Sequence, residues 1–104
     1  MSYTLYWRTR TGAFAPHALL AEAGQAVTEI EIPQGSDLHR QPEYLALNPA
    51  GRIPTLILPE GGVMTETGAM MLHLAERHPE AGLLPPLGDP ARAQVLRWLF
   101  FAQA

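Results

Sequence analysis

The chain alternates between short apolar segments and residues that break regular structure. Ten prolines and nine glycines are spread over 104 residues, so no helix or strand can run for long. A strand-like, a helical and a second strand-like segment come first, followed by a short helical stretch, two short apolar runs and another helical pattern. This order, β-α-β-α-β-β-α, predicts a small α/β domain with helices on both faces of one sheet.

Residue patterns predict where each element lies. We expect strands at 3–7, 27–32, 54–58 and 63–64, and helices at about 12–24, 42–47, 65–78 and from 90 onward. Gly24 is expected to end the first helix in the left-handed conformation, and Thr65 and Asp89 to cap the third and last helices. Alternation in the second strand predicts that Ile30 and Ile32 face the core.

Composition argues against several functions. The chain has no cysteine, which rules out disulfides, thiolate metal sites and a cysteine nucleophile. Its net charge of −3 argues against a general affinity for nucleic acid. No apolar run approaches the ~20 residues that cross a bilayer, and the N-terminus has no signal-peptide core, so we expect no membrane partner. His73 and His78 lie five apart in one predicted helix, a spacing that does not suit a metal pair, and we expect no metal.

Residues 79–89 are rich in proline and glycine, as is typical of a linker. In the segment that follows, Val95, Trp98 and Leu99 line one side of a predicted helix, and Phe100 and Phe101 widen its apolar face. An apolar face of this size predicts that further helical structure, or a partner chain, covers it.

Two segments beside the predicted hairpin could bind a ligand, and the first is Ile53-Pro54. A cis peptide bond there would turn the N–H and C=O of Ile53 away from the sheet, where they could pair with an extended peptide. The alternative is an ordinary trans proline at the first position of a strand, and spacing alone favours it.

The second segment is the start of the helix predicted at 65–78. The free N–H groups of its first turn and the hydroxyl of Thr67 could receive a carboxylate, and Glu66 could pair with an ammonium group. A ligand that carries both groups on one carbon, the α-amino-acid end of a molecule, would satisfy these features. A plain helix start with a favourable acidic residue is the commoner explanation of such a pattern.

Three motifs together resemble the N-terminal half of the cytosolic glutathione transferases. NPAGRIPTL at 48–56 is similar to the family's N-P-x-G-x-[VI]-P-x-L, which contains its cis-proline. TETGAMMLHLAE at 65–76 resembles [T/L]-E-[S/T]-x-A-I-x-x-Y-L-A, and FAPHALLAEAG at 14–24 resembles the family's first helix. The resemblance implies a thioredoxin-like α/β fold at 1–78, with a four-stranded mixed sheet and three helices. It also implies a linker at 79–89 and the start of an all-helical domain at 90–104.

The resemblance assigns roles to single residues. Ile53 would pair its backbone with the cysteinyl part of glutathione beside a cis Pro54. Glu66 and Thr67 would hold the amine and carboxylate of the γ-glutamyl group. Arg52 would reach the glycyl carboxylate or remain a solvated surface cation. Glutathione is therefore the expected co-substrate.

Which group would activate the thiol of glutathione stays open. The family uses a hydrogen bond from Tyr, Ser or Cys near the end of the first strand, which stabilises the thiolate. With Pro16-His17 as the anchor, Gly12 takes the place of the cysteine of bacterial members and offers no side chain. Tyr6 aligns with the tyrosine of other members, and Thr11 lies in the right loop. Thr9 and a backbone or arginine donor are further alternatives.

The implied function is transfer of the glutathione thiolate to a small electrophile by a cytoplasmic, homodimeric enzyme. Arg77 and Met70 lie on or near the helix that commonly meets the partner subunit. Because the family's electrophile pocket comes from the helical half, the 104-residue chain alone is expected to have little activity. The missing side chain at Gly12 supports the alternative, a non-catalytic glutathione-binding or protein-interaction module on the same fold.

Overall fold

A four-stranded mixed sheet lies at the centre of the structure, a computed structural model that describes residues 2–103. Strand β1 (Tyr3–Trp7) runs parallel to β2 (Val27–Glu31) and antiparallel to β3 (Thr55–Ile57). Strand β4 (Val63–Met64) pairs antiparallel with β3, which gives the spatial order β2-β1-β3-β4. The mixed sheet and its hairpin, expected from the sequence, are confirmed.

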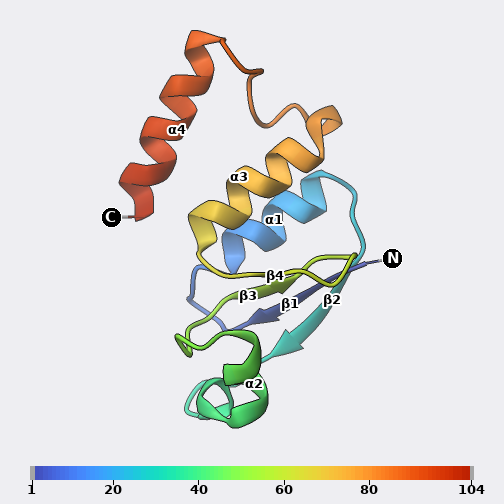
Figure 1. Ribbon diagram of the computed structural model, residues 1–104, viewed down its shortest axis with the longest axis vertical. Helices are drawn as coiled ribbons and strands as arrows, with labels where there is room; N and C mark the ends of the chain where they lie inside the picture. Colours follow the sequence, from blue (N-terminus) through green and yellow to red (C-terminus); the bar gives the residue numbers. More distant parts are fainter. Residues whose placement is uncertain (1, 104) are drawn as a thin grey trace.

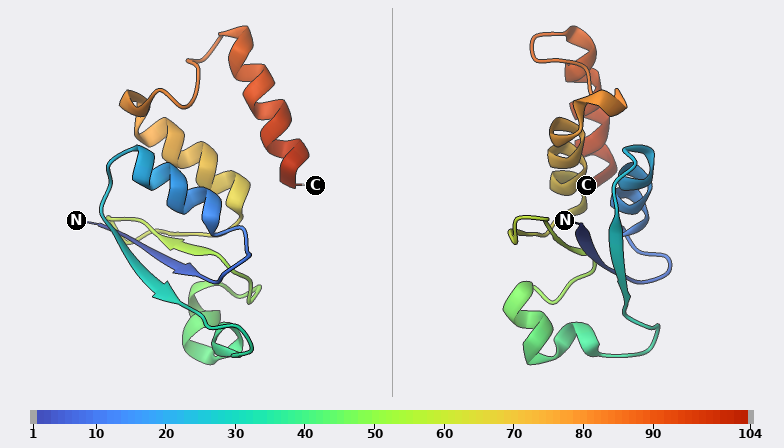
Figure 2. Two further views of the ribbon diagram at one scale, coloured as in Figure 1. Left: turned by 180° about the vertical axis from the view of Figure 1, so that it is seen from behind. Right: turned by 90° about the vertical axis from the view of Figure 1, so that its right-hand side faces the viewer.

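Helices cover both faces of this sheet. Helices α1 (Phe14–Glu22) and α3 (Thr67–Arg77) lie side by side on one face, and α2 (Pro42–Leu47) lies on the other (Figures 1 and 2). A short 3-10 turn, Leu38–Arg40, precedes α2. Gly24 follows α1 with a φ of 68°, the left-handed conformation predicted for the end of that helix.

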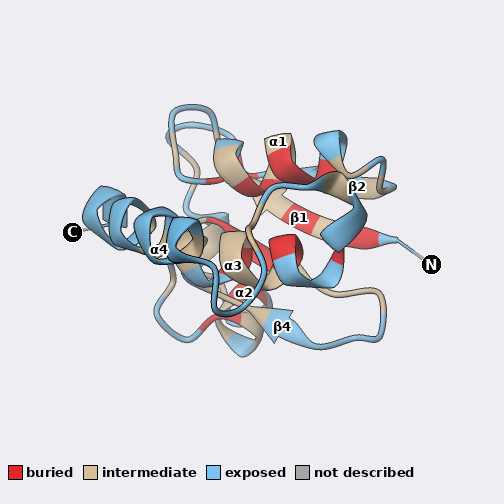
Figure 3. Cartoon of the chain, turned by 90° about the horizontal axis from the view of Figure 1, so that it is seen from above, coloured by how far each residue is buried: buried red, intermediate tan, exposed pale blue. Residues whose placement is uncertain are grey.

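The hydrophobic core fills the space between the sheet and the α1–α3 pair. Tyr3 and Leu5 from β1, Leu20 from α1, Leu56 from β3 and Met70 from α3 are each no more than 2% exposed. Figure 3 shows the buried residues gathered where α1, β1 and α3 meet. Burial of each such side chain contributes about 1.5–3 kcal/mol and holds the two helices on this face. Met70 lies on α3, the helix that the sequence resemblance associated with the partner subunit, and its own side chain is buried in this core.

Two local predictions are wrong. Ile30 is 38% exposed, because its side chain lies on the α2 face of the edge strand β2, where the covering is incomplete. Ile32, just beyond the strand, is buried as predicted. Thr65 does not cap α3: the chain turns at Glu66, which has a φ of 73°, and the cap position has no side-chain hydrogen bond.

Helix α4 (Pro90–Gln103) follows a proline-rich segment and a second 3-10 turn, Pro79–Ala81. Asp89 caps it as predicted, accepting a hydrogen bond of 2.8 Å from the N–H of Ala91. None of the described residues of α4 is buried, and Figure 3 shows the helix mostly in the colour of exposed residues. Trp98 remains 52% exposed. Among residues 2–103, no helix combines the length and the apolar character that crossing a membrane requires.

Candidate functional site

The segment before β3 and the start of α3 meet at a polar groove. Because β3 and β4 form one hairpin, the residue before the first strand and the residue after the second reach the same end of the sheet. The groove has a volume of about 210 Å³. Its lining residues are Asn48, Arg52, Ile53, Pro54, Thr65, Glu66, Thr67 and Gln103. The structure thus brings together all five residues that the sequence proposed for ligand binding.

At the entrance to β3, the backbone of Ile53 is available to a ligand. The Ile53–Pro54 peptide bond is cis, Pro54 is buried and Ile53 is half-buried. Within residues 2–103, neither the N–H nor the C=O of Ile53 has a hydrogen-bond partner in the chain. Backbone polar groups removed from water are normally paired. Ile53 therefore offers one donor and one acceptor to the main chain of a bound peptide.

A buried hydrogen-bond network holds this wall of the groove from behind. The Tyr44 hydroxyl donates to the carbonyl of Arg52 at 2.5 Å and lies 2.6 Å from Oγ1 of Thr55. Nδ2 of Asn48 donates to the same carbonyl at 3.0 Å and to Thr55 Oγ1 at 3.1 Å. Oδ1 of Asn48 accepts the N–H of Ala50 at 3.1 Å. Since Tyr44 has one proton and gives it to Arg52, the Thr55 hydroxyl donates to Tyr44.

Tyr44 stays protonated in this position. Burial raises the pKa of Tyr44 above its ordinary value, because the interior disfavours a phenolate. Hydrogen bonds from Thr55 and Asn48 act in the opposite direction and are weaker. The network therefore contains neutral groups whose donors and acceptors match, which makes it rigid.

The opposite wall is the first turn of α3. Helix α3 begins at Thr67, and Glu66 presents an exposed carboxylate. The N–H of Gly68 donates to Oε1 of Gln103 at 3.1 Å, so the end of α4 lies beside the start of α3, as Figure 1 also shows. Such a helix start carries partial positive charge, which suits an anion, while the Glu66 carboxylate suits a cation. The two features together fit a zwitterionic group.

The structure does not bring Tyr6 or Thr11 into this groove. The ring of Tyr6 packs edge-on against Tyr44, with ring centroids 5.4 Å apart, and lines a different hollow on the α2 face. The hydroxyl of Thr11 donates to the carbonyl of Arg8 at 2.6 Å and accepts the N–H of Ala13 at 3.3 Å. Thr11 thus shapes the loop before α1, and its hydroxyl is already engaged.

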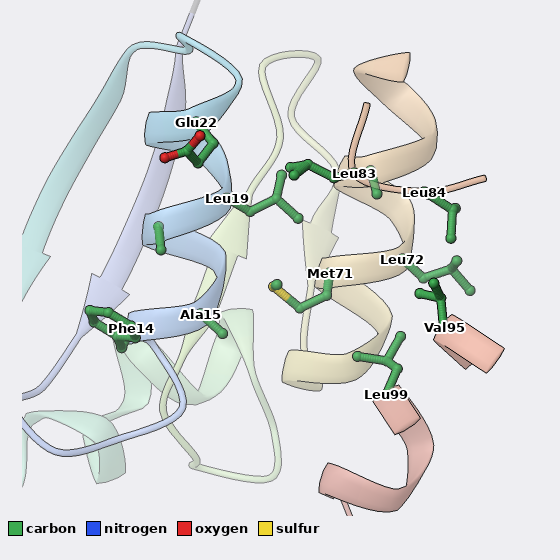
Figure 4. Close-up of a pocket in the computed structure, with 12 residues that line it drawn as sticks. Phe14, Ala15, Leu19, Glu22, Met71, Leu72, Leu83, Leu84, Val95 and Leu99 are labelled. Carbon is green, nitrogen blue, oxygen red and sulfur yellow. The ribbon is translucent and has the colours of Figure 1, made fainter. Parts of the chain in front are cut away.

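A larger cavity lies elsewhere, between α1, α3 and α4. It measures about 440 Å³, and Figure 4 shows it walled by side chains such as Leu19, Met71 and Leu99. Its lining is almost entirely aliphatic or aromatic, with Glu22 as its ionisable member. A site for a charged peptide needs several polar partners, so the smaller polar groove is the candidate site.

The described residues contain no cluster of metal-ligating side chains. His78 has a structural role, since its Nε2 lies 2.7 Å from the buried hydroxyl of Tyr3. Burial also raises the pKa of Tyr3. The pair anchors the end of α3 to the first strand.

Sequence reasoning missed three contributors to the site. Tyr44 lies in the short helix predicted at 42–47 and Asn48 directly follows it, and neither was proposed as a site residue. Gln103 reaches the groove from a helix 35 residues beyond Gly68. The tyrosine beside the apolar residues of the short helix was the available signal, because a buried phenol needs a partner for its hydroxyl.

Comparisons with known proteins point to one family. Residues 16–82 match the family described as glutathione S-transferase, N-terminal domain. The glutathione S-transferase GstA of Escherichia coli O157:H7 is 31% identical over 91% of this chain and 48% of its own length. The maleylacetoacetate isomerase of Pseudomonas aeruginosa is 48% identical over 88% of this chain and 43% of its own.

A solved structure of a glutathione transferase homologue from Sulfitobacter, with bound glutathione, superposes with a TM-score of 0.88. It is 34% identical and matches 96% of this chain and 48% of its own. The chain therefore spans about half the length of the relatives it matches. Its thioredoxin-like sheet, its polar groove and these matches lead to one conclusion: the chain belongs to the glutathione S-transferase family and carries the N-terminal domain of that family.

Proposed function

We propose that the polar groove binds glutathione and that the whole protein transfers the glutathione thiolate to a small electrophile. The observation that carries this proposal is the convergence of Ile53, Pro54, Glu66 and Thr67 on one groove. A homologue of the same fold binds glutathione in its crystal structure, which supports the same ligand here.

Each part of glutathione has a partner of matching chemistry. The backbone of Ile53 pairs with the cysteinyl residue, as a short strand would. The carboxylate of Glu66 holds the γ-glutamyl ammonium, and the hydroxyl of Thr67 with the start of α3 holds the γ-glutamyl carboxylate. Arg52 is exposed and lines the groove, where it faces the glycyl carboxylate.

Calorimetric titration with glutathione tests this assignment. Glu66→Ala should weaken binding by about tenfold or more, because a charge-assisted hydrogen bond is lost. Glu43→Ala is the matched control: Glu43 is also an exposed carboxylate near a helix start, and it lies outside the groove, so its removal should leave affinity unchanged. Failure of the unmodified protein to bind millimolar glutathione would refute the proposal.

The family resemblance implies an electrophile pocket formed by a helical half, and the chain spans about half the length of its relatives. We therefore expect little turnover by the chain on its own. Turnover equal to that of a longer protein would contradict this. We also propose that the enzyme is cytoplasmic and a homodimer, as the family resemblance implies.

A non-catalytic glutathione-binding module is the second candidate. Three residues of β1 and of the loop after it favour this candidate: Tyr6 faces away from the groove, Thr11 is engaged with Arg8, and Gly12 has no side chain. The absorbance of the thiolate of bound glutathione, followed against pH, separates the two candidates. A lowered pKa of the bound thiol supports the transferase, and an unshifted pKa supports the module.

A further inference from the structure

Gly12 lies directly against the side chain of Thr67. A methyl group added to Gly12 would place its Cβ 2.6 Å from Oγ1 of Thr67 and 3.5 Å from its Cβ. The same added atom would lie 3.7 Å from Cδ of Pro54, an ordinary contact. The space that a side chain at residue 12 would occupy is thus taken by the Thr67 hydroxyl.

The hydroxyl of Thr67 points toward this loop. Its Oγ1 donates to the carbonyl of Gly12 over a long 3.4 Å. A contact of this length is weak, so the proton is available for a better acceptor such as a carboxylate. The direction of the hydroxyl is therefore set by the room that Gly12 leaves.

Thr67 has little freedom to move aside. It is β-branched, so rotation about χ1 replaces the hydroxyl with the methyl group in the same crowded space. The remaining staggered position places a hydrogen against residue 12 and turns the hydroxyl away from its present direction. An alanine at residue 67 keeps only the Cβ, which lies 3.5 Å from the added atom, an ordinary contact.

We propose that Gly12 is a positioning residue for glutathione: the absence of a side chain at residue 12 leaves the space in which Thr67, which lines the groove, holds its hydroxyl. This inference rests on the proposed function, because the γ-glutamyl carboxylate is the acceptor that the hydroxyl would meet. Gly12 and Thr67 thus form a size-matched pair that joins the loop before α1 to the ligand-binding end of α3.

Four proteins, titrated with glutathione, test the pair: the unmodified protein, G12A, T67A and the double variant G12A/T67A. G12A should weaken binding by about tenfold or more, the loss expected when a hydrogen bond to a charged group is misaligned. T67A should weaken binding to a similar extent, because the hydroxyl is removed. G12A/T67A should bind no more weakly than T67A, since the hydroxyl that Gly12 positions is already absent.

G62A is the control for replacing a glycine. An added Cβ there lies 3.4 Å from Leu58 Cδ1, and Gly62 is remote from the groove, so affinity should not change. A purely structural role for Gly12 would lower the melting temperature of G12A while the folded protein bound glutathione normally. Normal binding by G12A, or losses of affinity in G12A and T67A that add up in the double variant, would overturn the proposal.

If the unmodified protein does not bind glutathione, the proposed function is refuted, and this result differs from those that would overturn the role of Gly12. The steric contact between residues 12 and 67 can then still be tested by melting temperatures. A smaller drop in melting temperature when G12A is introduced into T67A than into the unmodified chain supports the pair, and equal drops overturn it.

Discussion

The two walls of the polar groove are built in different ways. The wall at 48–55 is fixed from behind by the buried side chains of Tyr44, Asn48 and Thr55, whose polar groups satisfy one another. The wall at the start of α3 depends on a left-handed Glu66 and on a weak contact between Thr67 and Gly12. Changes behind the first wall should therefore cost stability, whereas changes in the second should cost binding.

Asn48→Ala should break the first wall most severely. It removes two donated hydrogen bonds and leaves the N–H of Ala50 without its acceptor. We expect the free energy of unfolding to fall by about 3 kcal/mol, measured by urea denaturation. Asn48→Asp restores the acceptor for Ala50 but not the donors, so it should recover only part of the loss. A loss below about 1 kcal/mol for Asn48→Ala would show that the network is not rigid.

Tyr44→Phe should have a smaller effect, about 1–2 kcal/mol, because Asn48 still donates to the Arg52 carbonyl. Tyr6→Phe is the matched control. Tyr6 packs edge-on against Tyr44, and no described partner bonds its hydroxyl, so the loss of that hydroxyl should change the unfolding free energy by less than about 0.5 kcal/mol. Equal losses of unfolding free energy in Tyr44→Phe and Tyr6→Phe would show that the hydrogen bonds of the Tyr44 hydroxyl do not stabilise the fold.

Alkaline solution should weaken the first wall in a further, graded way. Burial raises the pKa of Tyr44 and of Tyr3 in the folded state above the ordinary value of 10.0. The stability that depends on these two phenols remaining protonated is therefore fully present below pH 10. It is lost as the pH rises through their pKa values in the folded state. Urea midpoints above pH 10 should fall with pH, and less steeply in Tyr44→Phe. If the urea midpoint fell equally steeply with pH in the unmodified protein and in Tyr44→Phe, Tyr44 would not contribute to the alkaline loss of stability.

Arg10→Gly tests the loop beside the second wall and should have the smallest effect. Arg10 has a φ of 64°, a conformation that costs most residues about 1 kcal/mol and glycine almost nothing. Glycine also loses more entropy on folding, so the unfolding free energy should rise by only about 0.5 kcal/mol. Urea denaturation measures the change, and a loss of stability would indicate that the Arg10 side chain makes a needed contact.

The sequence allowed much of the fold to be predicted, because local patterns decide it. The breaks at Gly24 and Asp89 and the hairpin between 54 and 64 follow from residue types alone. The binding residues Ile53, Pro54, Glu66 and Thr67 could be proposed together only through the resemblance of two motifs on either side of that hairpin. Neither motif by itself favoured a ligand over an ordinary strand or helix start.

Features that depend on distant neighbours could not be predicted. The exposure of Ile30 depends on how far α2 covers the edge strand, and alternation within a strand does not report this. The partners of the Tyr44 hydroxyl lie 8 and 11 residues away, beyond a turn whose path is not encoded locally. The contact between Gly12 and Thr67 joins residues 55 apart, so only the folded chain reveals it.

The hairpin that joins the two walls has its own turn at the opposite end of the strands. Pairing of Leu56 with Met64 and of Ile57 with Val63 sets the walls' spacing, so the turn at 59–62 is not needed to maintain it. Glu60, Gly61 and Gly62 are exposed there. Doubling the length of such a loop costs only about 0.6 kcal/mol. A peptide epitope or fluorescent label could be inserted at this turn to follow the protein while ligand capture proceeds undisturbed.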